Sequence, residues 1–221
     1  MQHTPNIAPS AQLLISSQCP HCKAVLAHLS ELVKSGELAH LSVDNVDQLP
    51  ELAHELGVRA LPWIKIGEFE FTGVQTLSQL REWIQRTVEA SGKAQWFTEL
   101  MSSREVESVV KHLEDKPEDF DAILELLGEA DTELVVRIGI GVVMESFAGQ
   151  PGLQDRVPAL EELCKHEDPR VRADSCHYLG LSGDIRAIGT LQECLNDNDA
   201  DVRESAADAL EALNETRGPI H

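Results

Sequence analysis

Residues 17–23, Ser-Gln-Cys-Pro-His-Cys-Lys, decide how the first part of this chain folds. They follow an apolar segment, Leu13-Leu14-Ile15, and lead into an amphipathic run. A cysteine at the start of a helix lies beside unpaired backbone N–H groups and the positive end of the helix dipole, which stabilise its thiolate. Cys22 stands three residues after Cys19, close enough to form a disulfide with it. Pro20 is expected in the first helical turn, where its missing N–H costs nothing. The stretch therefore indicates a redox-active cysteine pair.

Strand and helix patterns alternate on either side of this pair. Apolar periodicity predicts strands at 11–16, 38–43, 60–67 and 68–72. It predicts helices from the cysteine pair to 33, over 49–56 and over 77–88. Glycines at 36 and 57 suit the ends of the first two helices. The expected order is β-α-β-α-β-β-α.

This order resembles the thioredoxin fold, with Cys19-Pro20-His21-Cys22 after the first strand and Leu61-Pro62 opening the third. The resemblance implies that Pro62 has a cis peptide bond and lies beside the cysteine pair, where the neighbouring backbone can pair with a substrate strand. It also implies that Cys19 is the nucleophile and Cys22 the resolving thiol of a disulfide exchange reaction. His21 either favours the Cys19 thiolate when protonated or is an ordinary solvated helix residue.

The chain departs from two subfamilies within this resemblance. Thioredoxins proper have a tryptophan before the motif and a buried acid beneath it, whereas Gln18 stands here and the first strand has no acid. Glutaredoxins hold glutathione with a glycine- and acid-containing segment, and the matching residues 71–76 keep one glycine and no acid. We therefore expect a redox-active disulfide without a bound cofactor, and glutathione specificity is doubtful.

A metal site is the alternative for Cys19 and Cys22, because a C-x-x-C pair is also half of a structural zinc site. The other half would be a second pair of closely spaced ligands. His40 and His54 are isolated in this part of the sequence, and the other cysteines fall in the second half. The sequence thus favours redox chemistry over zinc or an iron–sulfur cluster, and we predict no metal.

Charge and length limit the classes of partner. The chain has 221 residues and a net charge of −20. Residues 1–90 contain 10 acidic and 6 basic residues, and residues 91–221 contain 28 and 12. So acidic a second half argues against nucleic acid and anionic membranes as partners, although a basic protein would suit it. No run approaches the ~18 apolar residues of a membrane span.

The second half is expected to be a helical repeat. Asp168-Pro-Arg-Val-Arg recurs 31 residues later as Asp199-Ala-Asp-Val-Arg, and a fainter copy leads into a helix at 134–137. These copies resemble HEAT repeats, in which the aspartate ends the turn between two helices, the valine enters the core and the arginine contacts the neighbouring repeat. We expect helix pairs at 118–148, 151–181 and 183–214, with 94–114 as a cap and Ser91-Gly92-Lys93 as a linker.

Three further cysteines, Cys164, Cys176 and Cys194, fall on apolar helix faces. The simplest interpretation is that they are small buried residues. A metal or redox cluster of Cys164 and Cys176 with His166 and His177 is the alternative. Gly139-Ile-Gly141 lacks a preceding strand and is interpreted as a close helix contact.

Together these observations predict an α/β thioredoxin-like domain at 10–90 followed by an all-α HEAT-like domain at 94–214. Residues 1–10 lack the pattern of a secretory signal, and five cysteines show no disulfide framework, so we expect a cytoplasmic protein. The predicted function is that of a thiol–disulfide oxidoreductase whose helical repeats recognise protein substrates or partners. The alternative is a non-catalytic redox-sensing scaffold or adaptor.

Overall fold

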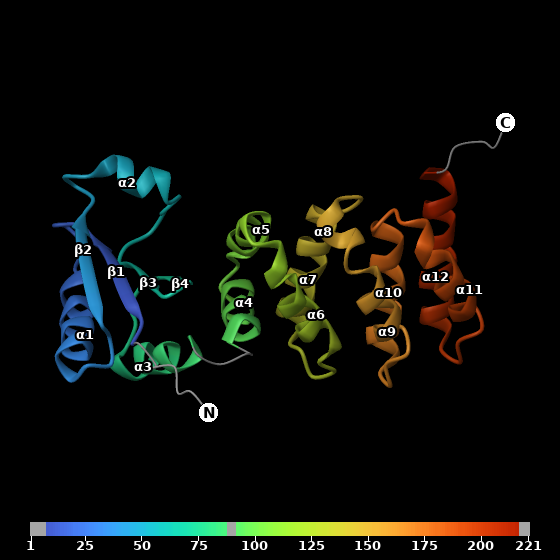
Figure 1. The fold of residues 1–221 in the computed structure, drawn as a ribbon, viewed down its shortest axis with the longest axis horizontal. Coiled ribbons are helices and arrows are strands. Elements are labelled where there is room, and N and C mark those ends of the chain that lie inside the picture. Colours follow the sequence, from blue (N-terminus) through green and yellow to red (C-terminus); the bar gives the residue numbers. More distant parts are fainter. Residues whose placement is uncertain (1–7, 88–91, 217–221) are drawn as a thin grey trace, which may run out of the picture. The chain divides into compact units, whose positions relative to one another are not determined.

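The computed structural model describes residues 8–87 and 92–216 of the chain (Figure 1). They fall into two compact units, one ending at Gly92 and one beginning at Lys93. Ser91 and Val88, expected in a linker and in a helix, lie outside the described residues. Gly92 already belongs to a helix. No helix within the described ranges has both the length and the apolar character needed to cross a membrane.

The first unit has the predicted order β-α-β-α-β-β-α. Its strands are β1 (Ser10–Ile15), β2 (His40–Asn45), β3 (Trp63–Ile66) and β4 (Phe69–Thr72). Its helices are α1 (Cys22–Ser35), α2 (Pro50–Glu55) and α3 (Leu77–Arg86). The observed β2 begins and ends two residues later than predicted, and β3 begins after the proline rather than before it. Proline cannot donate a backbone hydrogen bond to a neighbouring strand, which explains the later start of β3.

The strands form one mixed sheet in the order β2-β1-β3-β4. β1 pairs with β2 in parallel and with β3 in antiparallel orientation, and β4 completes an antiparallel hairpin with β3. Trp63, the first residue of β3, lies opposite Leu14, the last but one of β1. The segment before β3 therefore lies at the same edge of the sheet as the segment that follows β1.

The core of this unit lies where α1 and α3 meet the sheet. Leu13 and Leu14 of β1 are fully buried, as are three residues of α1 spaced to share one face, namely Val25, Leu29 and Leu32. The Trp83 ring of α3 contacts Phe69 and Phe71 at centroid distances of 5.3 and 4.5 Å. In contrast, α2 has no buried residue. The residues around the cysteine pair are thus fixed by α1 and β1, which share the same core.

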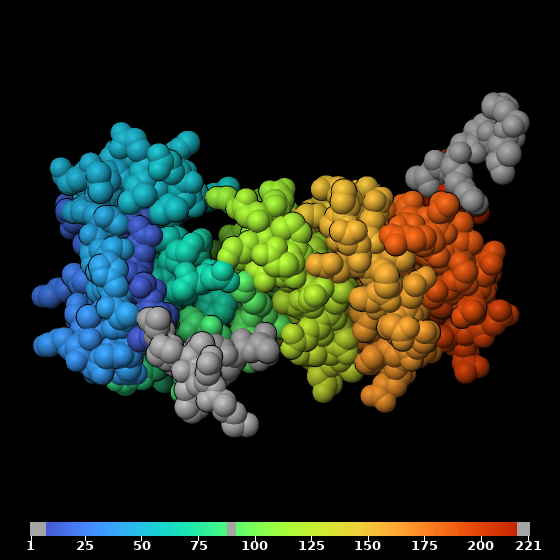
Figure 2. All heavy atoms as spheres, in the orientation of Figure 1, coloured from blue at the N-terminus to red at the C-terminus, as the bar shows by residue number. Residues whose placement is uncertain are grey.

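The second unit consists of helices alone in the residues described. Its first helices are α4 (Gly92–Ser102) and α5 (Val106–Asp115). Three further groups follow: η1 (Pro117–Phe120) with α6 (Asp121–Gly128) and α7 (Leu134–Ser146); α8 (Pro151–Gln154) with α9 (Val157–Leu163) and α10 (Pro169–Leu181); and η2 (Ile185–Ala187) with α11 (Ile188–Cys194) and α12 (Ala200–Thr216). The groups coincide with the three helix pairs predicted from the sequence. The space-filling view shows them following one another in sequence order along this unit (Figure 2).

Glycines bring helices of the second unit close together. A Cβ atom added to Gly139 of α7 would lie 2.7 Å from the Met101 side chain of α4. One added to Gly180 of α10 would lie 2.8 Å from the Cβ of Ala209 in α12. Real Cβ atoms do not approach other atoms so closely, so both contacts require glycine. The interpretation of Gly139 as a close helix contact is confirmed.

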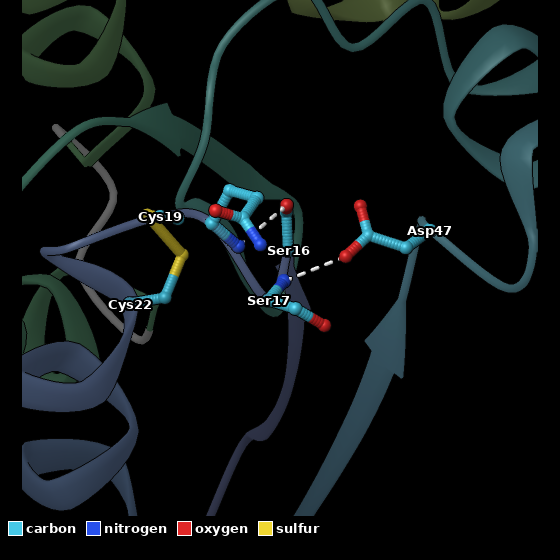
Figure 3. The surroundings of a disulfide bond; sticks show 6 residues. Ser16, Ser17, Cys19, Cys22 and Asp47 are labelled. Carbon is cyan, nitrogen blue, oxygen red and sulfur yellow. Dashed lines mark hydrogen bonds between the residues drawn. A yellow bond between two sulfur atoms is a disulfide. The ribbon is translucent and has the colours of Figure 1, made fainter.

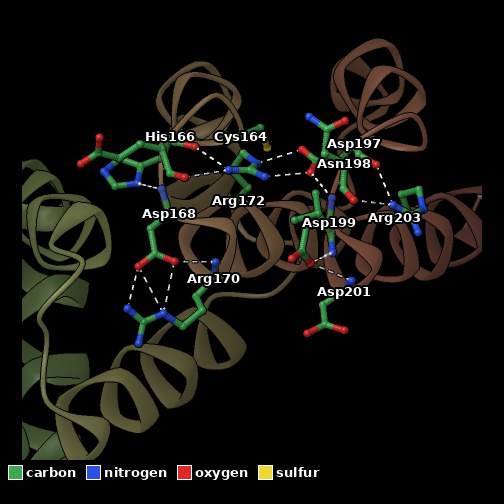
Figure 4. Close-up of polar contacts among 12 residues, drawn as sticks. Cys164, His166, Asp168, Arg170, Arg172, Asp197, Asn198, Asp199, Asp201 and Arg203 are labelled. Atoms are coloured by element: carbon green, nitrogen blue, oxygen red, sulfur yellow. Dashed lines mark hydrogen bonds and ion pairs between the residues drawn. The ribbon is translucent and has the colours of Figure 1, made fainter.

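The repeated Asp-x-x-Val-Arg residues hold the turns between paired helices (Figure 4). The Asp168 carboxylate accepts the backbone N–H of Arg170 at 2.8 Å and caps α10, while Val171 is fully buried. The Arg172 guanidinium donates to both Asp197 carboxylate oxygens at 2.8 Å, and Asp197 belongs to the next repeat. These contacts match the roles expected from the sequence: a cap, a core residue and a link between repeats.

Candidate redox site

Cys19 and Cys22 form a disulfide between β1 and α1 (Figure 3). Their Cα atoms are 5.5 Å apart, within the usual range for such a bond. α1 begins at Cys22 with His21 as its N-cap, so Pro20 lies in the turn before the helix. The prediction that Pro20 stands in the first helical turn is therefore wrong. Cys19 therefore lies ahead of the helix N-terminus, facing the end at which backbone N–H groups lack helical partners.

The two sulfurs differ in exposure. Cys22 is 3% exposed and packs with the first turn of α1, whereas Cys19 is half-buried. His21 is exposed, and its side chain makes no capping hydrogen bond. An incoming disulfide can thus reach Cys19 more readily than Cys22. This asymmetry suits the roles of nucleophile and resolving thiol expected for the pair.

The loop after β2 positions the segment that leads to Cys19. The Ser17 backbone N–H donates to the Asp47 carboxylate at 2.7 Å (Figure 3). The Asn45 side-chain amide donates to the Ser17 hydroxyl at 3.2 Å. The hydrogen bond from the Ser17 backbone, together with the hydroxyls of Ser16 and Ser17, lowers the pKa of Asp47 below its ordinary value. Sequence reasoning missed Asp47 and Asn45, because the only signal was a polar stretch at the end of a strand.

The Leu61–Pro62 peptide bond is cis, as the resemblance implied. Pro62 is buried and directly precedes β3, at the sheet edge where β1 leads into the cysteine loop. The Pro62 carbonyl accepts the Gly73 backbone N–H at 2.8 Å. This hydrogen bond ties the loop after β4 to the same edge. The sheet therefore gathers the disulfide loop, the cis-proline and residues 73–76 at one end.

The 73–76 loop provides an apolar side chain at this edge, and two backbone donors beside it have partners within the protein. Val74 is exposed. Thr76 caps α3 and forms a reciprocal pair with Gln79, in which each accepts the other's backbone N–H. These two donors, which would otherwise be open at the helix N-terminus, are thereby satisfied within the protein.

No carboxylate is buried beneath the disulfide in the part of the chain that the structure describes, where the buried polar residues are Gln75, Ser175 and Ser182. His40 and His54 are exposed on β2 and α2. They are not grouped with Cys19 and Cys22 as metal ligands among the described residues.

The cysteines of the second unit lie together, but not with the histidines that the sequence placed beside them. Cys164, Cys176 and Cys194 are all buried, with their sulfur atoms within 4.8 Å of one another. His177 is exposed, and the Nδ1 atom of His166 accepts the Asp168 backbone N–H at 3.1 Å. The prediction that the three cysteines are buried is confirmed. The proposed Cys/His grouping is wrong. His177 follows Cys176 along α10 and so points in a different direction, and His166 lies in the turn before α10.

Comparison with known protein families assigns both halves of the chain. A thioredoxin domain matches residues 11–85. HEAT repeats match residues 120–211. No curated protein matches the chain.

Proposed function

The chain is a thioredoxin-like domain joined to HEAT repeats, and from that premise we propose that it is a thiol–disulfide oxidoreductase acting on protein disulfides. The observation that carries the proposal is the disulfide itself: a half-exposed Cys19 and a buried Cys22 at a helix start. They lie at the sheet edge that also holds the cis-proline. Each feature has a separate role in disulfide exchange.

In the reduced protein, the Cys19 thiolate attacks one sulfur of a substrate disulfide. A Cys19–substrate bond forms, the substrate S–S bond breaks, and the departing substrate thiolate takes a proton from solvent. The Cys22 thiolate then attacks the Cys19 sulfur and releases the second substrate thiol. Two electrons have moved to the substrate, and the protein is left with the Cys19–Cys22 disulfide. An external dithiol must reduce this bond before the next cycle.

Substrate binding is proposed to use the backbone before the cis-proline. An extended substrate segment would pair with Leu61 and bring its disulfide to Cys19, while the exposed Val74 side chain contacts the substrate's apolar residues. Glutathione suits this edge poorly, because Thr76 and Gln79 satisfy each other's backbone donors. A protein disulfide is therefore the better substrate. The three buried thiols of the second unit further suggest a reducing compartment such as the cytoplasm.

HEAT repeats commonly mediate contacts between proteins, and α7 supplies a surface for one. Leu134, Ile138 and Val142 are 75%, 60% and 43% exposed, although they are large apolar residues. Their spacing of four residues puts them on one side of the helix. Glu133 and Glu145, both exposed, lie near the two ends of this apolar stripe. We propose that the stripe binds a protein segment that combines apolar side chains with lysine or arginine, which the acidic second half would attract.

Trapping the mixed disulfide tests the catalytic proposal. A Cys22→Ser variant retains the nucleophile but lacks the resolving thiol, so it should accumulate covalent adducts that a reductant releases. A Cys19→Ser variant is the matched control and should form none. Wild-type protein should reduce insulin disulfides with an added dithiol, and neither variant should turn over. If Cys19 titrates near the free thiol value of ~8.5 and no turnover is seen, the enzyme proposal fails and the scaffold remains.

A second pair of variants tests the stripe. Leu134→Ser with Ile138→Ser should abolish co-purification of the non-covalent partner, and added salt should weaken the wild-type complex. Leu195→Ser is the matched control, because Leu195 is another exposed apolar residue of the second unit. If the Leu195→Ser control loses the partner as fully as the double variant does, the stripe has no specific role.

A further inference from the structure

Three cysteines that no part of the proposed reaction uses meet inside the HEAT repeats. Cys164 directly follows α9 as its C-cap, Cys176 lies within α10 and Cys194 is the last residue of α11. The Cys164 and Cys176 sulfurs are 3.9 Å apart, and all three sulfurs lie within 4.8 Å of one another. The sequence separates them by 12 and 18 residues, so only the packing of two successive repeats brings them together.

The three thiols are hydrogen-bond partners of one another. Hydrogen bonds with Cys176 and Cys194, together with burial, raise the pKa of Cys164. Hydrogen bonds from Cys164 and Cys176 lower the pKa of Cys194. The charged groups that act on Cys194 are the Arg172 guanidinium, which favours the thiolate, and the Asp197 carboxylate, which opposes it.

We propose that Cys164, Cys176 and Cys194 form a three-coordinate sulfur site for a soft, thiophilic metal ion, with Cu(I) as its occupant. Metal–sulfur bonds of about 2.3 Å would place three sulfurs about 4.0 Å apart around a central ion. The observed spacing of 3.9 to at most 4.8 Å requires only small side-chain rotations to reach that arrangement. Each copper–thiolate bond formed from a thiol releases one proton to solvent, and copper stays in the +1 state.

The ligand set distinguishes Cu(I) from zinc. Structural zinc is almost always four-coordinate, and catalytic zinc adds water to three protein ligands. No fourth histidine, cysteine or carboxylate joins the group among the described residues, and the three cysteines are buried. Soft thiolates favour Cu(I), which is satisfied by three sulfurs. Cys164 and Cys194 are 6% and 7% exposed, while Cys176 is fully buried, so an ion would enter past the first two.

The test uses the full chain with Cys19→Ser and Cys22→Ser, because a reduced C-x-x-C pair would itself bind copper. This parent is titrated anaerobically with Cu(I) in competition with a colorimetric Cu(I) chelator. We expect one equivalent per chain, only sulfur neighbours in the copper X-ray absorption spectrum, and a raised melting temperature, since the ion joins three helices. Adding Cys194→Ala should weaken binding roughly tenfold or more. Cys164→Ala and Cys176→Ala should do the same, with circular dichroism confirming that each variant is folded.

Several results would overturn the proposal. One is failure of the parent to retain copper against the chelator. Another is that each alanine variant retains copper as tightly as the parent does. A third is tighter retention of Zn(II) than of Cu(I), with a nitrogen or oxygen neighbour completing four-coordination. Cys164→Ala and Cys194→Ala change the two less buried ligands. They therefore test the proposal even if Cys176→Ala fails to fold.

Discussion

Replacing Gly180 by alanine tests whether the repeats pack as closely as the structure indicates. The added Cβ would lie 2.8 Å from the Cβ and 2.9 Å from the Cα of Ala209. Neither atom can rotate away, because both are fixed to the backbone of α12. The clash of the added Cβ with Ala209 can therefore be removed only if α10 and α12 move apart, along a contact that extends over much of both helices.

Two opposing effects determine how much Gly180→Ala changes the stability of the second unit. Alanine in place of glycine within a helix gains about 1 kcal/mol from backbone propensity. Overpacking a close contact costs about 1–3 kcal/mol, and the rigid neighbours favour the upper half of that range. The expected net loss of stability is about 1–2 kcal/mol. A loss of that size changes the population of opened molecules roughly 5- to 30-fold.

Hydrogen exchange measured by mass spectrometry on the full chain is the suitable assay, because it reports each helix separately and does not require both units to unfold in one transition. Peptides from 169–181 and 200–216 should exchange faster by that factor. Gly189→Ala is the matched control, since apart from its chain neighbours and the backbone of its own helix no atom lies within 4 Å of its added Cβ. This control should stabilise α11 by about 0.5–1 kcal/mol. If Gly180→Ala slows exchange as Gly189→Ala does, the close approach of α10 and α12 is refuted.

Three further predictions concern charged groups. Asp197→Asn removes one partner of the ion pair with Arg172, whose side chain is only 16% exposed. The free energy of unfolding measured in urea should fall by about 1.5–3 kcal/mol. Asp201→Asn is the control and should change it little, because Asp201 is exposed. Burial alone would raise the pKa of Asp119, but hydrogen bonds from Lys93 and His112 hold it below 3.8. The ionised Asp119 carboxylate therefore stabilises the fold fully above its unfolded-state pKa, and this contribution is lost as the pH falls through its folded-state pKa. Unfolding curves from pH 7 to 3 should show the loss, and Asp119→Asn should abolish this pH dependence. Asp47→Ala should speed amide exchange at Ser17 without a large change in overall stability, since Asp47 is exposed; unchanged exchange there would contradict its positioning role.

Local patterns were enough to predict the order of elements and the position of the cysteine pair between the first strand and the first helix. The apolar run Leu13-Leu14-Ile15 indicated β1, and alternating apolar residues indicated β4. The 3.6-residue spacing of Leu80 and Trp83 indicated α3. The cis form of Pro62 came from the resemblance to a family and not from the residues alone. The repeat signature predicted the roles of Asp168 and Arg172 because each copy places them at the same helix start.

What escaped prediction depends on contacts between distant segments. Asp47 and Ser17 are 30 residues apart and meet only because β1 and β2 run in parallel. The grouping of Cys164 with Cys194 likewise depends on how one repeat stacks on the next. The sequence offered the neighbouring histidines only as alternative partners, because adjacency along the chain is the only distance that a sequence shows. Periodicity shows which face of a helix is buried, but it does not show which residue of another helix it meets.

The link between Arg172 and Asp197 has a consequence for how the repeats respond to mechanical load. One repeat earlier, the position equivalent to Asp197 is His166. Arg137 bonds to Asp174 instead, and its other terminal nitrogen is buried without a partner among the described residues. α10 also contacts α12 far more extensively than it contacts α7. Under tension applied along the repeats, we expect the array to part first between α7 and α10, so that the last two repeats separate as one piece.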